Sequence, residues 1–122
     1  MKTVGIVCEY NPLHKGHRKQ LRAIRELCGE DTAIVCAMSG DFVQRGEFAV
    51  ADKFARAEMA VRCGADVVLE LPAPWSAATA EVFACGGVSA LQQTGVVTHL
   101  AFGSECGDAE KLMLLEIGRA HV

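Results

Sequence analysis

Nearly continuous apolar runs recur along the chain, separated by stretches in which apolar residues return at every third or fourth position. Runs that are continuous rather than alternating are typical of strands covered on both faces. Strands that alternate with helices predict a parallel, doubly wound α/β sheet. We expect the strands at Thr3 to Cys8, Ala33 to Ala37, Asp66 to Leu71 and Val97 to Phe102.

Capping residues and glycines mark the expected helices. A helix has a 3.6-residue period, is often capped by a short polar side chain and commonly stops at glycine. The helices are therefore expected from His17 through Leu27 with a stop at Gly29, from a cap at Asp52 to Ala60 or Arg62, and from Ala77 or Thr79 to Gln93.

The first strand runs into the turn "NPLHKGH", which places two histidines at the entry of a helix. Pro12 cannot join a strand ladder, so the strand ends just before it. In a parallel sheet, ligands bind beyond the carboxyl ends of the strands, where helix N-termini attract anions. His14 and His17 can face one phosphate, and Gly16 leaves room for a nucleotide. The pattern predicts attack on the α-phosphate of a nucleoside triphosphate, with pyrophosphate leaving.

Two other interpretations of the histidine pair stay open. A His-x-x-His pair also occurs by chance on exposed surfaces, and a zinc site would need a third ligand that the nearby sequence does not offer. The six cysteines are widely spaced, with no pair two to four residues apart. We therefore expect buried free thiols in a reducing compartment and no metal held by the protein.

Composition narrows the class of protein. The 122 residues are 51% hydrophobic and 22% charged, which is enough apolar sequence for one soluble domain with a core. No apolar run approaches the roughly 20 residues of a membrane helix, and no signal peptide is evident, so we expect a cytoplasmic protein without a membrane partner. A net charge of −3 argues against strong electrostatic binding of nucleic acid by this segment alone.

Polar residues also follow the second strand, in "SGDFVQRGE". Ser39, Asp41, Gln44 and Arg45 lie where the carboxyl edge of the sheet places ligand contacts. The loop is interpreted either as a contact with an acyl substrate or RNA, or as a plain surface turn.

Three further charged residues have structural interpretations. Lys53 and Arg56 are expected on a solvated helix face, although they can reach the same edge of the sheet. Glu70 closes a strand, and we expect a basic neighbour or helix amides to hold its carboxylate.

The C-terminus is interpreted separately. The last six residues, "IGRAHV", look like the translation of a common sequencing adapter. We expect residues 1–116 to form one incomplete nucleotide-binding domain and residues 117–122 to be non-native. The chain is then an N-terminal fragment of a longer protein.

Several blocks carry a family resemblance. "HKGH" resembles the HxGH signature of nucleotidyltransferases. With "GIVCEYNPLHKGH", "MSGDFVQRGE", "DKFARAEMAVRCGADVVLELP", "SAATAEVFACGGVSAL" and "FGSECGD", the chain resembles the bacterial tRNA(Met) cytidine acetate ligase family from Lys2 to about Asp108. The resemblance implies a Rossmann-like doubly wound sheet of the HxGH type, here truncated.

The resemblance implies an activity as well. Acetate and ATP would form acetyl-adenylate, and the acetyl group would pass to N4 of the wobble cytidine of elongator tRNA(Met). Magnesium is expected to accompany ATP, and tRNA is expected to bind mainly through a C-terminal part with no counterpart here. The alternatives are an adenylyltransferase acting on a phosphorylated cofactor precursor, or a non-catalytic nucleotide- or RNA-binding module.

The resemblance also implies site residues. His14 and His17 would be catalytic on the phosphates. The implied ATP contacts are Val7, Cys8, Glu9, Tyr10, Asn11, Pro12, Leu13, His14, Lys15, Gly16, His17, Arg18, Lys19, Gln20 and Gly103.

Overall fold

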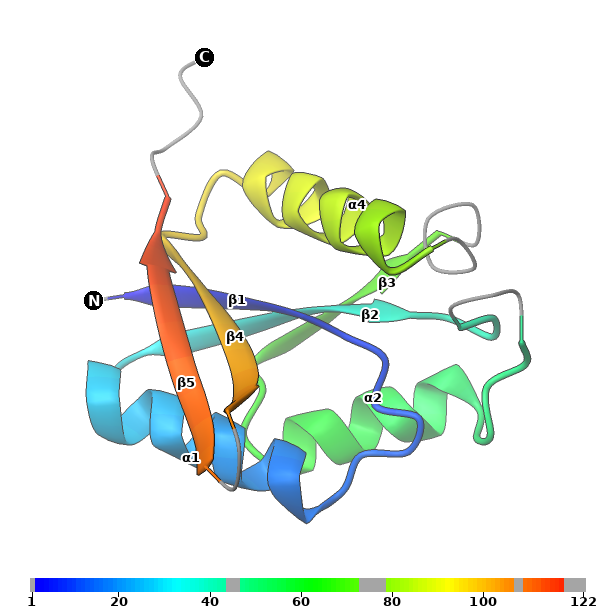
Figure 1. Cartoon of the computed structure of the whole chain (residues 1–122), viewed down its shortest axis with the longest axis horizontal. Coiled ribbons are helices and arrows are strands. Elements are labelled where there is room, and N and C mark those ends of the chain that lie inside the picture. The colour runs from blue at the N-terminus through cyan, green and yellow to red at the C-terminus, as the bar shows by residue number, and fades with distance from the viewer. Residues whose placement is uncertain (1, 44–46, 73–78, 107–108, 118–122) are drawn as a thin grey trace.

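The computed structural model describes residues 2–43, 47–72, 79–106 and 109–117, and at 103–106 and 109–111 it describes the backbone alone. These residues form a five-stranded sheet in the order β3-β2-β1-β4-β5, shown in Figure 1. The strands are β1 (Thr3–Cys8), β2 (Ala33–Ser39), β3 (Val67–Leu71), β4 (His99–Cys106) and β5 (Ala109–Glu116).

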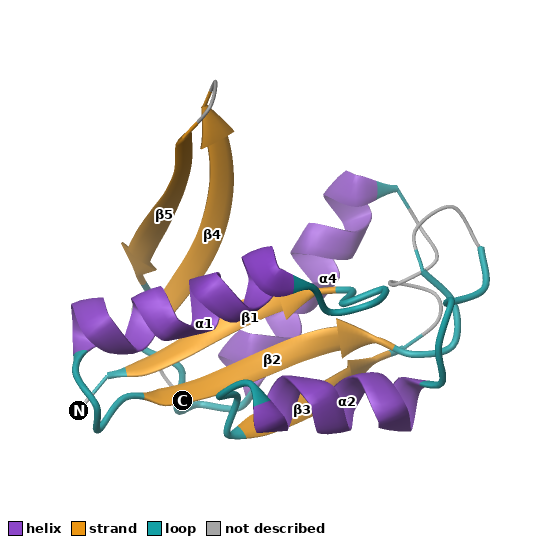
Figure 2. Ribbon diagram, turned by 90° about the horizontal axis from the view of Figure 1, so that it is seen from below, coloured by secondary structure: helices purple, strands orange, loops and turns teal. Residues whose placement is uncertain are grey.

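Helices cover both faces of the sheet. α1 (Lys15–Cys28) and α2 (Lys53–Arg62) lie on one face, and α4 (Ala80–Gln93) lies on the other (Figures 1 and 2). β1 pairs in parallel with β2, β2 with β3, and β1 with β4, so these four strands point the same way. The predicted doubly wound α/β arrangement is confirmed, and the carboxyl ends of β1 and β2 share one edge with the starts of the helices.

The end of the sheet differs from the prediction. β4 pairs with β1 at His99 and Leu100, then runs on to Cys106 and pairs with the antiparallel strand β5. Figure 2 shows this β4–β5 pair bending away from the rest of the sheet. The expected end of the fourth strand at Phe102 was therefore too early. β5 was not predicted, and its orientation makes the sheet mixed rather than wholly parallel. The boundary expected at residue 116 stays a prediction.

The core has one apolar cluster on each face of the sheet. On the α1 side, alternate residues of β1 and β2 pack against Leu21 and Ile24. On the α4 side, Leu91 packs among Val35, Ala37 and Leu100. Because successive strand residues point to opposite faces, the continuous apolar runs of β1 and β2 serve both clusters.

Helix α4 comes close to β1 at Gly87. A Cβ atom built there would lie 2.4 Å from Val7 Cγ1. Gly87→Ala gains about 1 kcal/mol of helix propensity, but overpacking typically costs about 1–3 kcal/mol. We expect urea unfolding to show a net loss of stability of about 1 kcal/mol.

Ser89→Ala on the exposed side of α4 is the control and should stay within about 0.5 kcal/mol of the unchanged chain. A more stable Gly87→Ala variant would show that α4 can move away from β1 without loss.

Candidate functional site

A cleft of about 570 Å³ opens at the carboxyl end of β1. Its walls come from the end of β1, the turn before α1, the first part of α1, α4 and β4. The lining residues are Ile6, Val7, Cys8, Glu9, Tyr10, Asn11, Pro12, His14, His17, Gln20, Phe83, Ala101 and Phe102.

The two histidines cap helix α1 reciprocally. His14 is the N-cap, and its Nδ1 accepts a hydrogen bond from the Gly16 amide at 3.1 Å. His17 Nδ1 accepts from the His14 amide at 3.2 Å, which completes a capping box. The two rings stack with centroids 3.7 Å apart. The local fold therefore fixes the position and the orientation of both rings.

These bonds also assign the tautomers. A nitrogen that accepts a hydrogen bond carries no proton, so each neutral ring carries its proton on Nε2. Both rings line the cleft. The pair can donate Nε2–H groups to an anion, beside the positive end of the α1 dipole.

The buried side chain of Tyr10 packs against the ring of His17. The φ of 46° at Tyr10 lies in the left-handed region, which is uncommon for a bulky residue. Its side chain is buried, its ring lies 4.9 Å from that of His17, and its hydroxyl lies 3.8 Å from Cys36 Sγ. Burial raises the pKa of Tyr10 and of the Cys8 thiol, so both stay neutral at physiological pH. The floor of the cleft therefore carries no negative charge from these groups.

Most of the implied ATP contacts lie on the cleft, and several do not. Leu13 is buried in the core, and Lys15, Arg18 and Lys19 are exposed on α1 without lining the cleft. Gly103 lies inside β4, where it pairs with Leu112 of β5, and does not end the strand. Gly16 is not a lining residue but supplies the amide that His14 accepts. The contacts with ATP themselves stay predictions.

Sequence reasoning missed the far wall of the cleft. Phe83 comes from α4, and Ala101 and Phe102 come from β4. Only the pairing of β4 with β1 and the packing of α4 bring these residues to the histidines.

The residues expected to make ligand contacts after β2 lie in different environments. Ser39 is fully buried and its hydroxyl has no hydrogen-bond partner among the described residues, while Asp41 is exposed and neither lines the cleft. Gln44 and Arg45 lie outside the described residues. Their contact with an acyl substrate or RNA stays a prediction.

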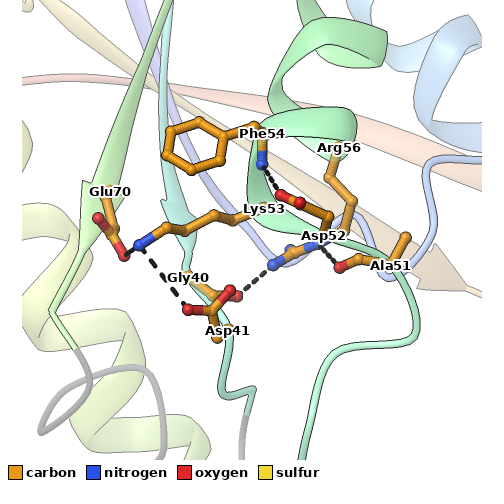
Figure 3. Close-up of polar contacts among 8 residues, drawn as sticks. All are labelled: Gly40, Asp41, Ala51, Asp52, Lys53, Phe54, Arg56 and Glu70. Atoms are coloured by element: carbon orange, nitrogen blue, oxygen red, sulfur yellow. Dashed lines mark hydrogen bonds and ion pairs between the residues drawn. The ribbon is translucent and has the colours of Figure 1, made fainter.

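Arg56 is not on a solvated face, which corrects the prediction. Its side chain is fully buried, and Nε donates to the Ala51 carbonyl at 3.0 Å. Nη1 donates to the Glu9 carbonyl at 2.5 Å, and Nη2 donates to the Gly40 carbonyl. Figure 3 shows the bonds from Arg56 to Ala51 and Gly40. The guanidinium thus joins the ends of β1 and β2 to the start of α2.

This buried cation has no carboxylate within ion-pair distance among the described residues. Burial lowers the pKa of Arg56, but an arginine keeps its charge at neutral pH. The carbonyl dipoles of three separate segments therefore solvate the charge.

Lys53 and Glu70 form the ion pair expected for Glu70. Lys53 Nζ lies 2.8 Å from Glu70 Oε1 and 3.8 Å from Asp41 Oδ2 (Figure 3). Gly40 makes room for this pair, because a Cβ there would lie 2.3 Å from Glu70 Oε1. The prediction of a basic neighbour is confirmed, and the Glu70 pair helps to hold the start of α2 against β3.

In the part of the chain that the structure describes, no three His, Cys, Asp or Glu side chains come together as metal ligands. Among the cysteines whose side chains the structure describes, five are free thiols. Cys8 and Cys36 are buried as expected, whereas Cys28 and Cys63 are half-buried and Cys85 is exposed. None of the described helices is long and apolar enough to cross a membrane.

Comparison with known proteins shows the family of this chain. Residues 1–119 match the family described as HIGH Nucleotidyl Transferase. The chain belongs to this family. The histidine pair at the start of α1 therefore lies within a HIGH nucleotidyltransferase domain.

Relatives of this HIGH nucleotidyltransferase domain carry a more specific name. A "tRNA(Met) cytidine acetate ligase" of Syntrophotalea carbinolica is 56% identical over 88% of this chain and 25% of the relative. One of Clostridium acetobutylicum is 48% identical over 94% of this chain and 28% of the relative. The chain thus spans about a quarter of the length of these curated relatives, and its resemblance to their family is confirmed.

A solved structure agrees with the HIGH nucleotidyltransferase fold. TmcAL of Thermotoga maritima, in a crystal structure bound with alpha-thio ATP, superposes with a TM-score of 0.80 at 54% identity. The match covers 86% of this chain and 25% of that one.

Proposed function

We propose that this chain forms the ATP-binding part of an enzyme that activates acetate as acetyl-adenylate and passes the acetyl group to N4 of the wobble cytidine of elongator tRNA(Met). The observation that carries the proposal is the pair of reciprocally capped histidines on the cleft. The relatives' name and the nucleotide analogue bound by the Thermotoga maritima protein support it.

The first step needs positioning and charge stabilisation rather than covalent work by the protein. An acetate oxygen attacks the α-phosphorus, the bond from that phosphorus to the bridging oxygen breaks, and pyrophosphate leaves. His14 and His17 would donate hydrogen bonds to phosphate oxygens as their charge develops, together with amides at the start of α1. Their rings need no rearrangement, because the capping bonds already hold them.

The second step transfers the acyl group. The cytidine N4 attacks the acyl carbon, the bond between that carbon and the phosphate oxygen breaks, and AMP leaves with the displaced electron pair while N4 loses a proton. Keeping the mixed anhydride from water until the amine arrives would limit hydrolysis. Magnesium would come bound to ATP, because the described residues do not assemble a metal site of their own.

The test is exchange between ATP and labelled pyrophosphate in a completed protein, in which residues 1–116 are joined to the remainder of the Thermotoga maritima relative. Exchange should require a carboxylic acid and should be faster with acetate than with propionate or glycine. ATP binding without exchange for any acid would contradict the proposal, and would favour an adenylyltransferase or a non-catalytic nucleotide-binding module.

A further inference from the structure

Two short segments that follow β2, Asp41–Val43 and Glu47–Val50, pair with each other and expose aromatic side chains. Phe42 and Phe48 face each other across an antiparallel bridge, with ring centroids 4.9 Å apart. The Ala49 amide donates to the Asp41 carbonyl at 2.8 Å, which fixes the base of the hairpin. Phe48 and Val50 are each 77% exposed. We call the described residues Asp41–Val43 and Glu47–Val50 the Phe42–Phe48 hairpin.

The hairpin is attached to the wall of the cleft. The Val50 amide donates to Asn11 Oδ1 at 2.6 Å, and Asn11 lines the cleft beside the histidines. The next residue, Ala51, is held through its carbonyl by buried Arg56. The exposed aromatic surface is therefore fixed next to the place where the adenylate would form.

We propose that the Phe42–Phe48 hairpin receives an unpaired base of an RNA substrate, an inference that rests on the proposed function. A base that reacts must leave its stack, and enzymes hold such bases against aromatic or apolar side chains. The N4 amine of a cytidine must approach the acyl-adenylate, so a surface beside the cleft is where that base has to enter.

Charge favours a base over the RNA backbone. The described residues of the hairpin include the exposed carboxylates of Asp41 and Glu47, the first of them 3.8 Å from Lys53 Nζ, and no basic side chain that could bind a phosphate. An exposed phenylalanine instead offers a face on which any base can stack. Backbone contacts would then come from elsewhere in the protein, and the hairpin would hold the base.

Phe48→Ser in the completed protein tests the inference. Binding of an anticodon stem–loop RNA with an unpaired wobble cytidine, measured without ATP or acetate, should weaken about tenfold. The kcat/KM for acetylation of that RNA should fall by a similar factor, while acetate-dependent pyrophosphate exchange stays within about twofold. Phe48→Trp should restore RNA binding, because a larger aromatic face stacks as well.

Leu27→Ser is the matched control, because Leu27 is 63% exposed near the end of α1 and should leave RNA binding unchanged. Unchanged RNA binding by Phe48→Ser would overturn the inference. The inference would also be overturned if Phe48→Ser lowered the melting temperature by more than about 5 °C and Phe48→Trp failed to restore RNA binding. The Phe48 ring would then pack against the rest of the protein instead of binding a base. The RNA-binding measurement does not require acetate activation, so it tests the hairpin even if pyrophosphate exchange is absent and the proposed function fails.

Discussion

His17→Ala is expected to lower the rate of acetate-dependent pyrophosphate exchange in the completed protein by about 10²–10³-fold. Loss of one donor aimed at the charge of a transition state typically costs this much. The Kd for ATP should rise by a smaller factor, because on the proposed mechanism the ring would also contact the ground-state phosphates. RNA binding should stay within about twofold, and circular dichroism should show a folded protein.

Arg22→Ala is the control for this variant, because Arg22 is exposed on α1 and does not line the cleft. It should keep the full exchange rate. If His17→Ala lowered exchange and RNA binding equally, the ring would be holding the structure together rather than acting on the phosphates.

Arg56→Met is expected to lower the free energy of unfolding by about 3–5 kcal/mol. Methionine fills much of the same space but donates no hydrogen bonds. The carbonyls of Glu9, Gly40 and Ala51 would lose their donors, and each buried polar group left unpaired costs about 1–3 kcal/mol. Urea unfolding measures the loss.

Arg56→Lys separates the charge from the shape of the guanidinium. An ammonium group keeps the charge but lacks the planar fork that reaches three separate carbonyls. We expect it to lose about 2–4 kcal/mol, and we expect ATP binding to weaken because Glu9 lines the cleft.

Arg62→Lys provides the exposed comparison, since Arg62 pairs with Glu58 on the surface of α2. It should change stability by no more than about 0.5 kcal/mol. An Arg56→Lys variant as stable as the unchanged chain would mean that the buried charge alone joins the strand ends.

The sequence predicts the layout of this domain because its signals are local. The strand ending before Pro12 and the glycine stop of α1 are read from neighbouring residues, and the parallel strands follow from their apolar runs. The position of His14 and His17 at the carboxyl edge follows as well. Their reciprocal capping does not, because histidine is not among the residues that usually cap helices.

Other features escaped prediction because they depend on distant segments. Arg56 belongs to a residue type that is almost never buried unless paired, and its three acceptors come from separate parts of the chain. β5 consists entirely of Ala, Glu, Lys, Leu and Met, which favour helix, and it becomes a strand by pairing with β4. Phe83 reaches the cleft only through the packing of α4.

The capping bonds of the histidines limit how this domain can be engineered for thermal stability. Rules for improving helix ends would replace His14 with Asp, Asn or Ser, which are stronger N-cap residues. Such a change would strengthen the start of α1 and remove a ring from the cleft. This turn therefore has to be left out of any consensus or cap-optimised redesign, and stabilising changes belong on surfaces away from it, such as the exposed side of α4.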